Sequence, residues 1–191
     1  MSTRIATLSA GNTEVGWFDP ATLAALTEHL APATTTPGDL VAGFWEGWGD
    51  LNGSSTFAIG WQSDDELTGA ERAAQLADVE RRAAEHRAAQ EALVASLAGP
   101  RLEWPERDFI LLNMDLSQLA DPAWLGRAAI GHYRDFGHTP QLLWPEDHTW
   151  VMASEIDWDS TIVAGSRNLI EAVLADNRFE AFEVHEHDDL S

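Results

Sequence analysis

Apolar positions near the N-terminus follow the 3.6-residue period of a helix. Asp19 and Pro20 are typical of a helix start, because aspartate is a good N-cap and proline is tolerated at the first helical position. Leu23, Leu26 and Leu30 then fall on one side of the predicted helix. The pattern predicts an amphipathic helix that ends near the next proline.

Residues 69–98 predict the longest helix of the chain. Thr68 and Glu71 have the spacing of a capping box, and Gly99-Pro100 supplies a stop. At about 1.5 Å per residue this helix reaches roughly 40 Å. Its apolar side is thin and weighted towards alanine, which leaves two alternatives: the helix packs on its own domain, or it is partly exposed and pairs with a second copy or a partner.

Short apolar and aromatic runs predict strands at residues 40–45, 56–61, 109–112, 141–144, 149–157 and 179–184. The first two flank turn-forming residues at 50–55 and predict a hairpin. Asp121-Pro122 predicts a second, short helix, and Gly165-Ser166 introduces a further helix with a clear apolar stripe.

These elements predict one α+β domain over residues 1–191. Its sheet is antiparallel or mixed, because the strands come in hairpin-like pairs instead of regular βα alternation. Helices flank the sheet, and one of them is the long alanine-rich helix. The tail at 185–191 is acidic and is expected to fray.

The composition agrees with a packed globular chain. The 191 residues are 45% hydrophobic and 23% charged, so wholesale disorder is not indicated. No run approaches the roughly 18 apolar residues of a membrane span, and the first residues lack the basic region and apolar core of a signal peptide. We therefore expect a cytoplasmic protein.

The net charge of −21 changes the functional picture most. Phosphate would be repelled, so nucleic acids and anionic membranes are not expected partners. The charge favours a basic protein partner, or it serves only to keep the protein dispersed. No cysteine is present, which removes disulfides and thiolate chemistry. No nucleotide-binding or metal-ligand motif occurs either, so no cofactor and no metal is expected.

Acidic and aromatic residues crowd into the segment that follows Trp144. If residues 149–159 form one strand, alternation places Glu155, Asp157 and Asp159 on one face and Trp158 on the other. Three carboxylates in this spacing have three possible roles: a solvated strand face, a partner-binding surface, or a metal or catalytic site.

A second dense cluster is FWEGWGD at residues 44–50. Glycines between Trp45 and Trp48 allow close approach of backbone and rings, which builds either a tight core corner or an aromatic pocket. Burial would raise the pKa of Glu46 and suit it to proton transfer. The two clusters give one candidate binding set: Trp45, Glu46, Trp48, Trp144, Glu155, Asp157, Trp158 and Asp159.

The segments FWEGWG and LWPEDHTWVMASEIDWDSTIVAGS resemble an uncharacterised family of small actinobacterial proteins. That family has a WEG(W/Y)G element followed by a WP(E/A)DR-W-x-x-ATEID-x-D-x-T-x-V-G-G-S element. His148 stands here where the family pattern has arginine, Ser154 where it has threonine, and Ala164 where it has glycine. The resemblance implies an α+β fold and a bacterial cytoplasmic setting, and it brings no known activity.

The sequence favours a non-enzymatic, acidic binding protein that presents the two tryptophan-rich and acidic segments to a basic protein partner. One alternative is an enzyme whose carboxylates, Glu46, Glu155, Asp157 and Asp159, line an aromatic pocket. The other is a homo-oligomeric structural protein joined through the long helix.

Overall fold

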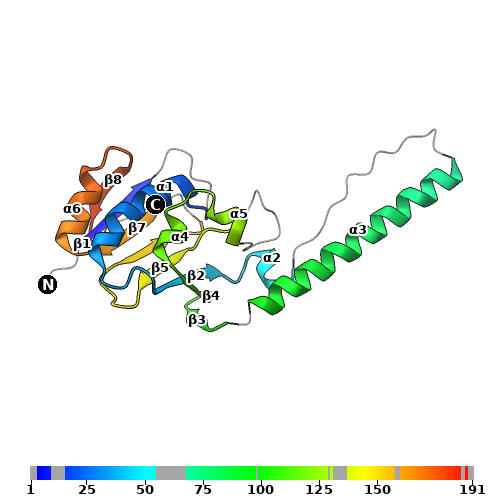
Figure 1. Ribbon diagram of the computed structural model, residues 1–191, viewed down its shortest axis with the longest axis horizontal. Helices are drawn as coiled ribbons and strands as arrows, with labels where there is room; N and C mark the ends of the chain where they lie inside the picture. The colour runs from blue at the N-terminus through cyan, green and yellow to red at the C-terminus, as the bar shows by residue number, and fades with distance from the viewer. Residues whose placement is uncertain are drawn as a thin grey trace. The chain divides into compact units, whose positions relative to one another are not determined.

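Eight antiparallel strands form one sheet in the part of the chain that the structure describes, in the order β3-β4-β2-β5-β6-β7-β1-β8 (Figure 1). The strands are β1 Arg4–Ser9, β2 Leu40–Trp45, β3 Arg101–Trp104, β4 Arg107–Met114, β5 Leu142–Pro145, β6 Val151–Ser154, β7 Thr161–Gly165 and β8 Glu180–Val184. Every neighbouring pair runs antiparallel. The predicted α+β class with an antiparallel sheet is confirmed.

The computed structural model describes residues 4–9, 16–54, 68–97, 99–128, 130, 137–157, 160–185 and 188. The chain divides into two compact units. The first combines Met1–Trp45 with Gly99–Ser191 and contains the sheet, and the second is Glu46–Ala98. None of the described helices is long and apolar enough to cross a membrane.

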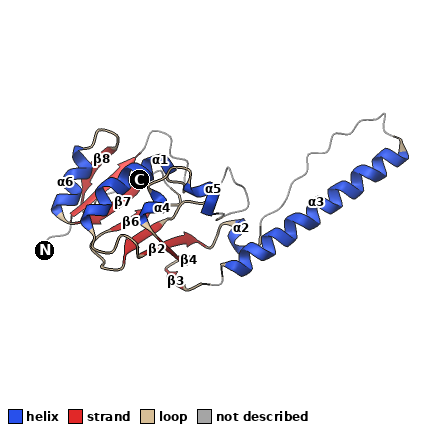
Figure 2. Cartoon of the chain, viewed as in Figure 1, coloured by secondary structure: helices blue, strands red, loops and turns tan. Residues whose placement is uncertain are grey.

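Helices of the first unit form a layer against the sheet (Figure 2). They are α1 Pro20–Leu30, the 3-10 turn η1 Ala31–Ala33, α4 Leu116–Leu119, α5 Trp124–Ala128 and α6 Arg167–Ala175. Helix α6 contacts β1, β7 and β8, and α1 contacts both α4 and α6. The predicted starts of two helices are confirmed, because Asp19 accepts a hydrogen bond from the Thr22 amide and Ser166 accepts one from the Leu169 amide.

Alternation gives the sheet two different faces. Towards the helices, the core side chains are almost completely buried, as shown by Phe44, Leu143 and Val163 at 0% exposure. The register places the intervening residues on the opposite side, which we call the open face. Its apolar members include Ile5, Leu102, Trp104, Leu142, Trp144, Val151, Ala153, Ile162, Ala164, Phe182 and Val184.

The second unit contains α2 Gly49–Asn52 and α3 Gly69–Ser96. The predicted capping box of α3 is confirmed, since Thr68 and Glu71 exchange side-chain and backbone hydrogen bonds. Gln90 donates to the Gly49 carbonyl at 3.1 Å and links the two helices. Most of the described surface of α3 is exposed, including Leu76 at 44%. Assembly of copies through this helix stays a prediction.

Several predicted boundaries differ from the observed ones. The strand expected at 149–157 is β6 alone, because the Glu155 amide turns to the Ser160 carbonyl and the Glu155 side chain accepts from the Ile156 amide. The turn expected at 50–55 begins as helix α2. Strands β1 and β3 were not predicted. The expected strand 56–61 lies outside the described residues, as does most of the acidic tail.

Truncation of a large side chain should cost much more stability on the core face than on the open face. Leu143→Ala, in the core, should lower the free energy of unfolding by about 2–5 kcal/mol. Phe182→Ala, at 58% exposure on the open face, should change it by less than about 0.5 kcal/mol. Urea denaturation followed by circular dichroism measures both. Equal losses would contradict the assignment of the faces.

Candidate functional site

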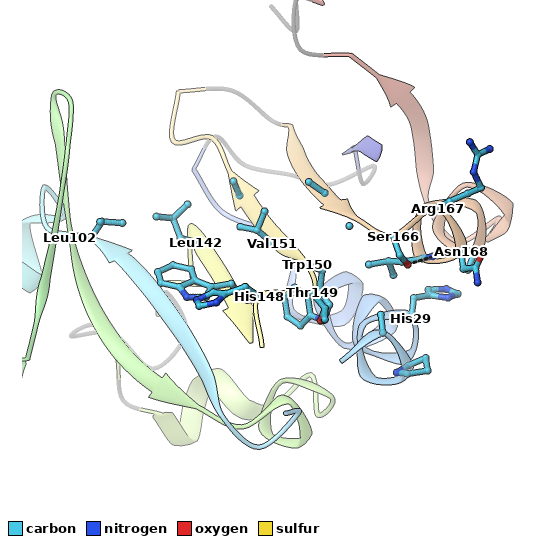
Figure 3. Close-up of a pocket in the computed structure, with 18 of the residues that line it drawn as sticks. His29, Leu102, Leu142, His148, Thr149, Trp150, Val151, Ser166, Arg167 and Asn168 are labelled. Atoms are coloured by element: carbon cyan, nitrogen blue, oxygen red, sulfur yellow. Dashed lines mark hydrogen bonds between the residues drawn. The ribbon is translucent and has the colours of Figure 1, made fainter. Parts of the chain in front are cut away.

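A hollow of about 1340 Å³ runs along the open face and past the ends of β5, β6 and β7. Figure 3 shows Leu102, Leu142 and Val151 at one end of it and Ser166, Asn168 and His29 at the other. We call these the sheet end and the helix end. All of these residues belong to the first unit.

Small side chains between large ones create the sheet end. Ala153 pairs with Leu142 across β5 and β6, and Ala164 pairs with Val151 across β6 and β7. Trp144 provides an aromatic wall from β5. Because each alanine leaves the space that a larger side chain would fill, the sequence builds a depression in an otherwise apolar surface.

The helix end collects polar side chains from three elements, beside apolar ones such as Trp150 and Leu169. His29 comes from the end of α1, His148 from the β5–β6 turn, and Ser166, Arg167 and Asn168 from the start of α6. Among the described residues that line the hollow there is no aspartate or glutamate. The full chain has 32 of them, so the hollow differs in charge from the rest of the surface.

Asp147 fixes the turn that carries His148 and Thr149. Its carboxylate accepts hydrogen bonds from the Thr34 hydroxyl at 2.9 Å, the Thr35 amide at 2.7 Å and the Thr149 hydroxyl at 2.8 Å. Burial alone would raise the pKa of Asp147, but these hydrogen bonds hold it well below its usual range. The ionised carboxylate therefore ties the segment after η1 to the β5–β6 turn.

Ion pairs fix the opposite wall of the helix end. His29 Nε2 lies 2.7 Å from Asp176 Oδ2, which connects the end of α1 to the residue that follows α6. Arg178 donates to both Asp176 and Glu28. Hydrogen bonds from Arg178 and His29 hold the pKa of Asp176 well below its usual range. These contacts hold the two helices together beside the hollow.

Two of the predicted carboxylates meet outside the hollow. Arg107 in β4 donates a hydrogen bond from one guanidinium nitrogen to Glu155. It donates another from the second nitrogen to Asp157 Oδ2, at an N–O distance of 2.5 Å. Burial opposes ionisation of Glu155, but Arg107 and the amides of Ile156 and Asp157 lower its pKa. In the described part of the chain, no group of three histidine, aspartate or glutamate side chains could hold a metal ion.

The predicted binding residues therefore occupy different places. Trp45 and Trp144 both lie on the open face, and only Trp144 lines the hollow. Glu155 and Asp157 pair with Arg107. Glu46 and Trp48 belong to the second unit, and Trp158 and Asp159 lie outside the described residues.

Sequence reasoning missed Trp104, His29 and the start of α6 as parts of a site. Leu102 and Trp104 alternate with charged neighbours, and this strand signal could have revealed Trp104. Nothing local connects His29 with Ser166, which lie far apart in the sequence. Their proximity to one hollow comes only from the fold.

The hydrogen bonds of Asp147 predict a pH-dependent loss of stability in the variant Asp147→Asn. At pH 7 the melting temperature should fall by about 2–4 °C. Because the folded-state pKa is depressed, the stabilisation is present above the ordinary value of 3.8 and is lost as the pH falls through the lower folded-state pKa. The difference between wild type and variant should therefore shrink in acid.

Thermal unfolding between pH 7 and pH 2 measures this effect. Asp39→Asn is the matched control, since the Asp39 side chain makes none of these contacts. Equal melting temperatures of wild type and Asp147→Asn at pH 7 would show that the hydrogen bonds do not stabilise the turn.

Comparisons with protein-family models, with curated proteins and with solved structures find no match. The resemblance to the actinobacterial family stays an expectation. The geometry and charge of the hollow are therefore the basis for a functional proposal.

Proposed function

We propose that this protein binds an elongated, mainly apolar molecule with a single acidic end group in the hollow. One observation carries the proposal. The described lining of a large surface depression contains no carboxylate, in a chain with a net charge of −21.

The size and walls of the sheet end favour an apolar ligand body. Pockets for drug-sized molecules have volumes of about 300–1,000 Å³, so the hollow has room for a longer ligand. Leu142, Trp144 and Val151 provide apolar contact surface. Each square ångström of apolar surface removed from water contributes about 25 cal/mol, and this makes burial the main source of affinity.

The helix end favours an acidic group on that ligand. Arg167 can donate hydrogen bonds to a carboxylate, and the His148 imidazole adds a further polar contact, while His29 Nε2 is bonded to Asp176. Arg167 already lies 3.6 Å from Glu171, an exposed pair that a ligand carboxylate can replace at small cost. The overall negative charge repels polyanions, so one acidic group fits better than several.

The arrangement supports binding more than acid–base catalysis by the predicted carboxylates. Glu155 and Asp157 are held by Arg107, and neither lines the hollow. Recognition of a basic protein by the acidic and tryptophan-rich segments is a separate proposal. Glu155 and Asp157 do not line the hollow, whereas Trp144 and Trp150 do.

Three ligands with one chain length and different end groups test the proposal. Isothermal titration calorimetry with dodecanoate, dodecanol and dodecylammonium, each below its micelle concentration, gives their dissociation constants. We expect dodecanoate to bind most tightly and dodecylammonium most weakly. Tightest binding of the ammonium compound, or no binding of any of the three, would overturn the proposal.

Two variants and one control locate the binding. Ala153→Phe fills the sheet end and should weaken dodecanoate binding at least tenfold. Arg167→Gln should weaken dodecanoate severalfold and leave dodecanol unchanged. Phe182→Ala is the matched control, because Phe182 lies on the same face of the sheet but does not line the hollow.

A further inference from the structure

The β3–β4 hairpin ends in a tip that extends past the neighbouring strand. Trp104 pairs with Arg107 around a two-residue turn. Strand β2 ends at Trp45, which pairs with Phe109, so Arg107 and Asp108 have no partner in β2. Strand β3 is the first strand in the order of the sheet, and among the described strands it pairs only with β4.

The register leaves backbone groups of β3 directed to the outside. The Leu111 amide donates to the Pro100 carbonyl at 2.9 Å. Hydrogen-bonded and non-hydrogen-bonded pairs alternate in an antiparallel ladder, so Leu102 and Trp104 bond to β4. The amide and carbonyl of Glu103 then point away from β4, at the edge of the sheet. An added strand could pair with them.

One face of the tip carries two carboxylates that form no ion pair within the described residues, although Arg101 lies two positions before Glu103 on the same face. Glu103 lies directly opposite Asp108, and both are exposed. Like charges in directly opposed positions are unfavourable. Arg107 lies on the other face of the hairpin and is bonded to Glu155 and Asp157. Arg101 donates to the Gly99 carbonyl.

The opposite face of β3 is apolar. Leu102 and Trp104 lie there, and Trp104 is 57% exposed. A strand placed beside β3 would put alternate side chains next to Glu103, with Asp108 one strand farther away, and the others next to Leu102 and Trp104. The other edge strand, β8, differs, because Arg4 pairs with Glu183 at 3.1 Å and compensates its charge.

We infer that the edge of β3 accepts an extended segment of a partner protein in which basic and apolar side chains alternate. The segment adds a ninth strand to the eight-stranded sheet. Its backbone bonds to Glu103, its basic side chains neutralise Glu103 and Asp108, and its apolar side chains cover Trp104. This site places the basic partner expected from the net charge at Glu103 and Asp108 of the hairpin.

An acetylated and amidated octapeptide of alternating arginine and valine is the probe. Fluorescence anisotropy of a labelled peptide, at about 0.15 M salt, gives the dissociation constant. The double variant Glu103→Gln, Asp108→Asn should weaken binding at least tenfold. The double variant Glu180→Gln, Glu183→Gln at β8 removes the same number of charges and should change the dissociation constant less than twofold.

Two further measurements separate strand addition from simple charge attraction. Hydrogen exchange of the Glu103 amide should slow at least tenfold when the peptide is bound. The same peptide with N-methyl groups on its arginine residues, whose amides face Glu103 when the segment pairs antiparallel, should bind at least tenfold more weakly.

Three results would overturn the inference. They are no binding of the peptide at millimolar concentration, equal loss of affinity in the two double variants, and equal affinity of the methylated peptide. The double variant Glu103→Gln, Asp108→Asn removes a repulsion from an exposed tip. Circular dichroism and thermal unfolding should therefore show a fold at least as stable as that of the wild type.

Discussion

Side-chain alternation across the eight-stranded sheet is the constraint on which both proposed surfaces depend. Strand β6 shows it in four residues: Met152 is buried in the core, while Val151 and Ala153 lie on the open face. A shift of one residue would exchange the two sets. The core fixes the register, because moving Met152 to the open face would remove it from its apolar neighbours. Burial of the core face therefore fixes which side chains lie on the open face.

The distribution of charged side chains then makes the hollow and the β3–β4 tip different from each other. Within the first unit, Arg4, Arg107, Arg127, Arg167 and Arg178 each pair with carboxylates. These pairs use the few cations of a very acidic chain to hold elements together. The described lining of the hollow contains no carboxylate, whereas Glu103 and Asp108 at the β3–β4 tip form no ion pair within the described residues. The two proposals therefore assign opposite ligand charges to the hollow on the open face and to the carboxylates on the other face of the tip.

Local sequence signals predict where helices and strands lie along the chain, but not which strands pair in the sheet. The start of α6 could be predicted because Ser166 is a good N-cap and an apolar stripe follows. The strand at 141–144 could be predicted from its apolar run, and it is β5. No local signal places β5 between β2 and β6. The order of strands depends on long-range pairing, and each functional surface depends on that order.

The candidate site shows the same limit. Asp157 was identified as a surface acid, but its partner Arg107 is 50 residues away in the sequence. Its charge could be read from the sequence, while its neutralisation could not. The acidic segment predicted a partner-binding strand because alternation was extended past Ser154. The Glu155 amide donates to the Ser160 carbonyl, and the Glu155 carboxylate accepts from the Ile156 amide. Strand β6 therefore ends at Ser154, and Asp157 does not continue its face.

Trp104 connects the two proposed surfaces. It lines the sheet end of the hollow, and it is also the exposed aromatic side chain of the edge strand. A ligand in the hollow and a strand beside β3 would both contact its indole. Any preference of one occupant for a particular orientation of Trp104 changes the affinity of the other. By thermodynamic linkage the two effects are equal. A residue shared in this way would couple the two proposed sites, the hollow and the edge of β3.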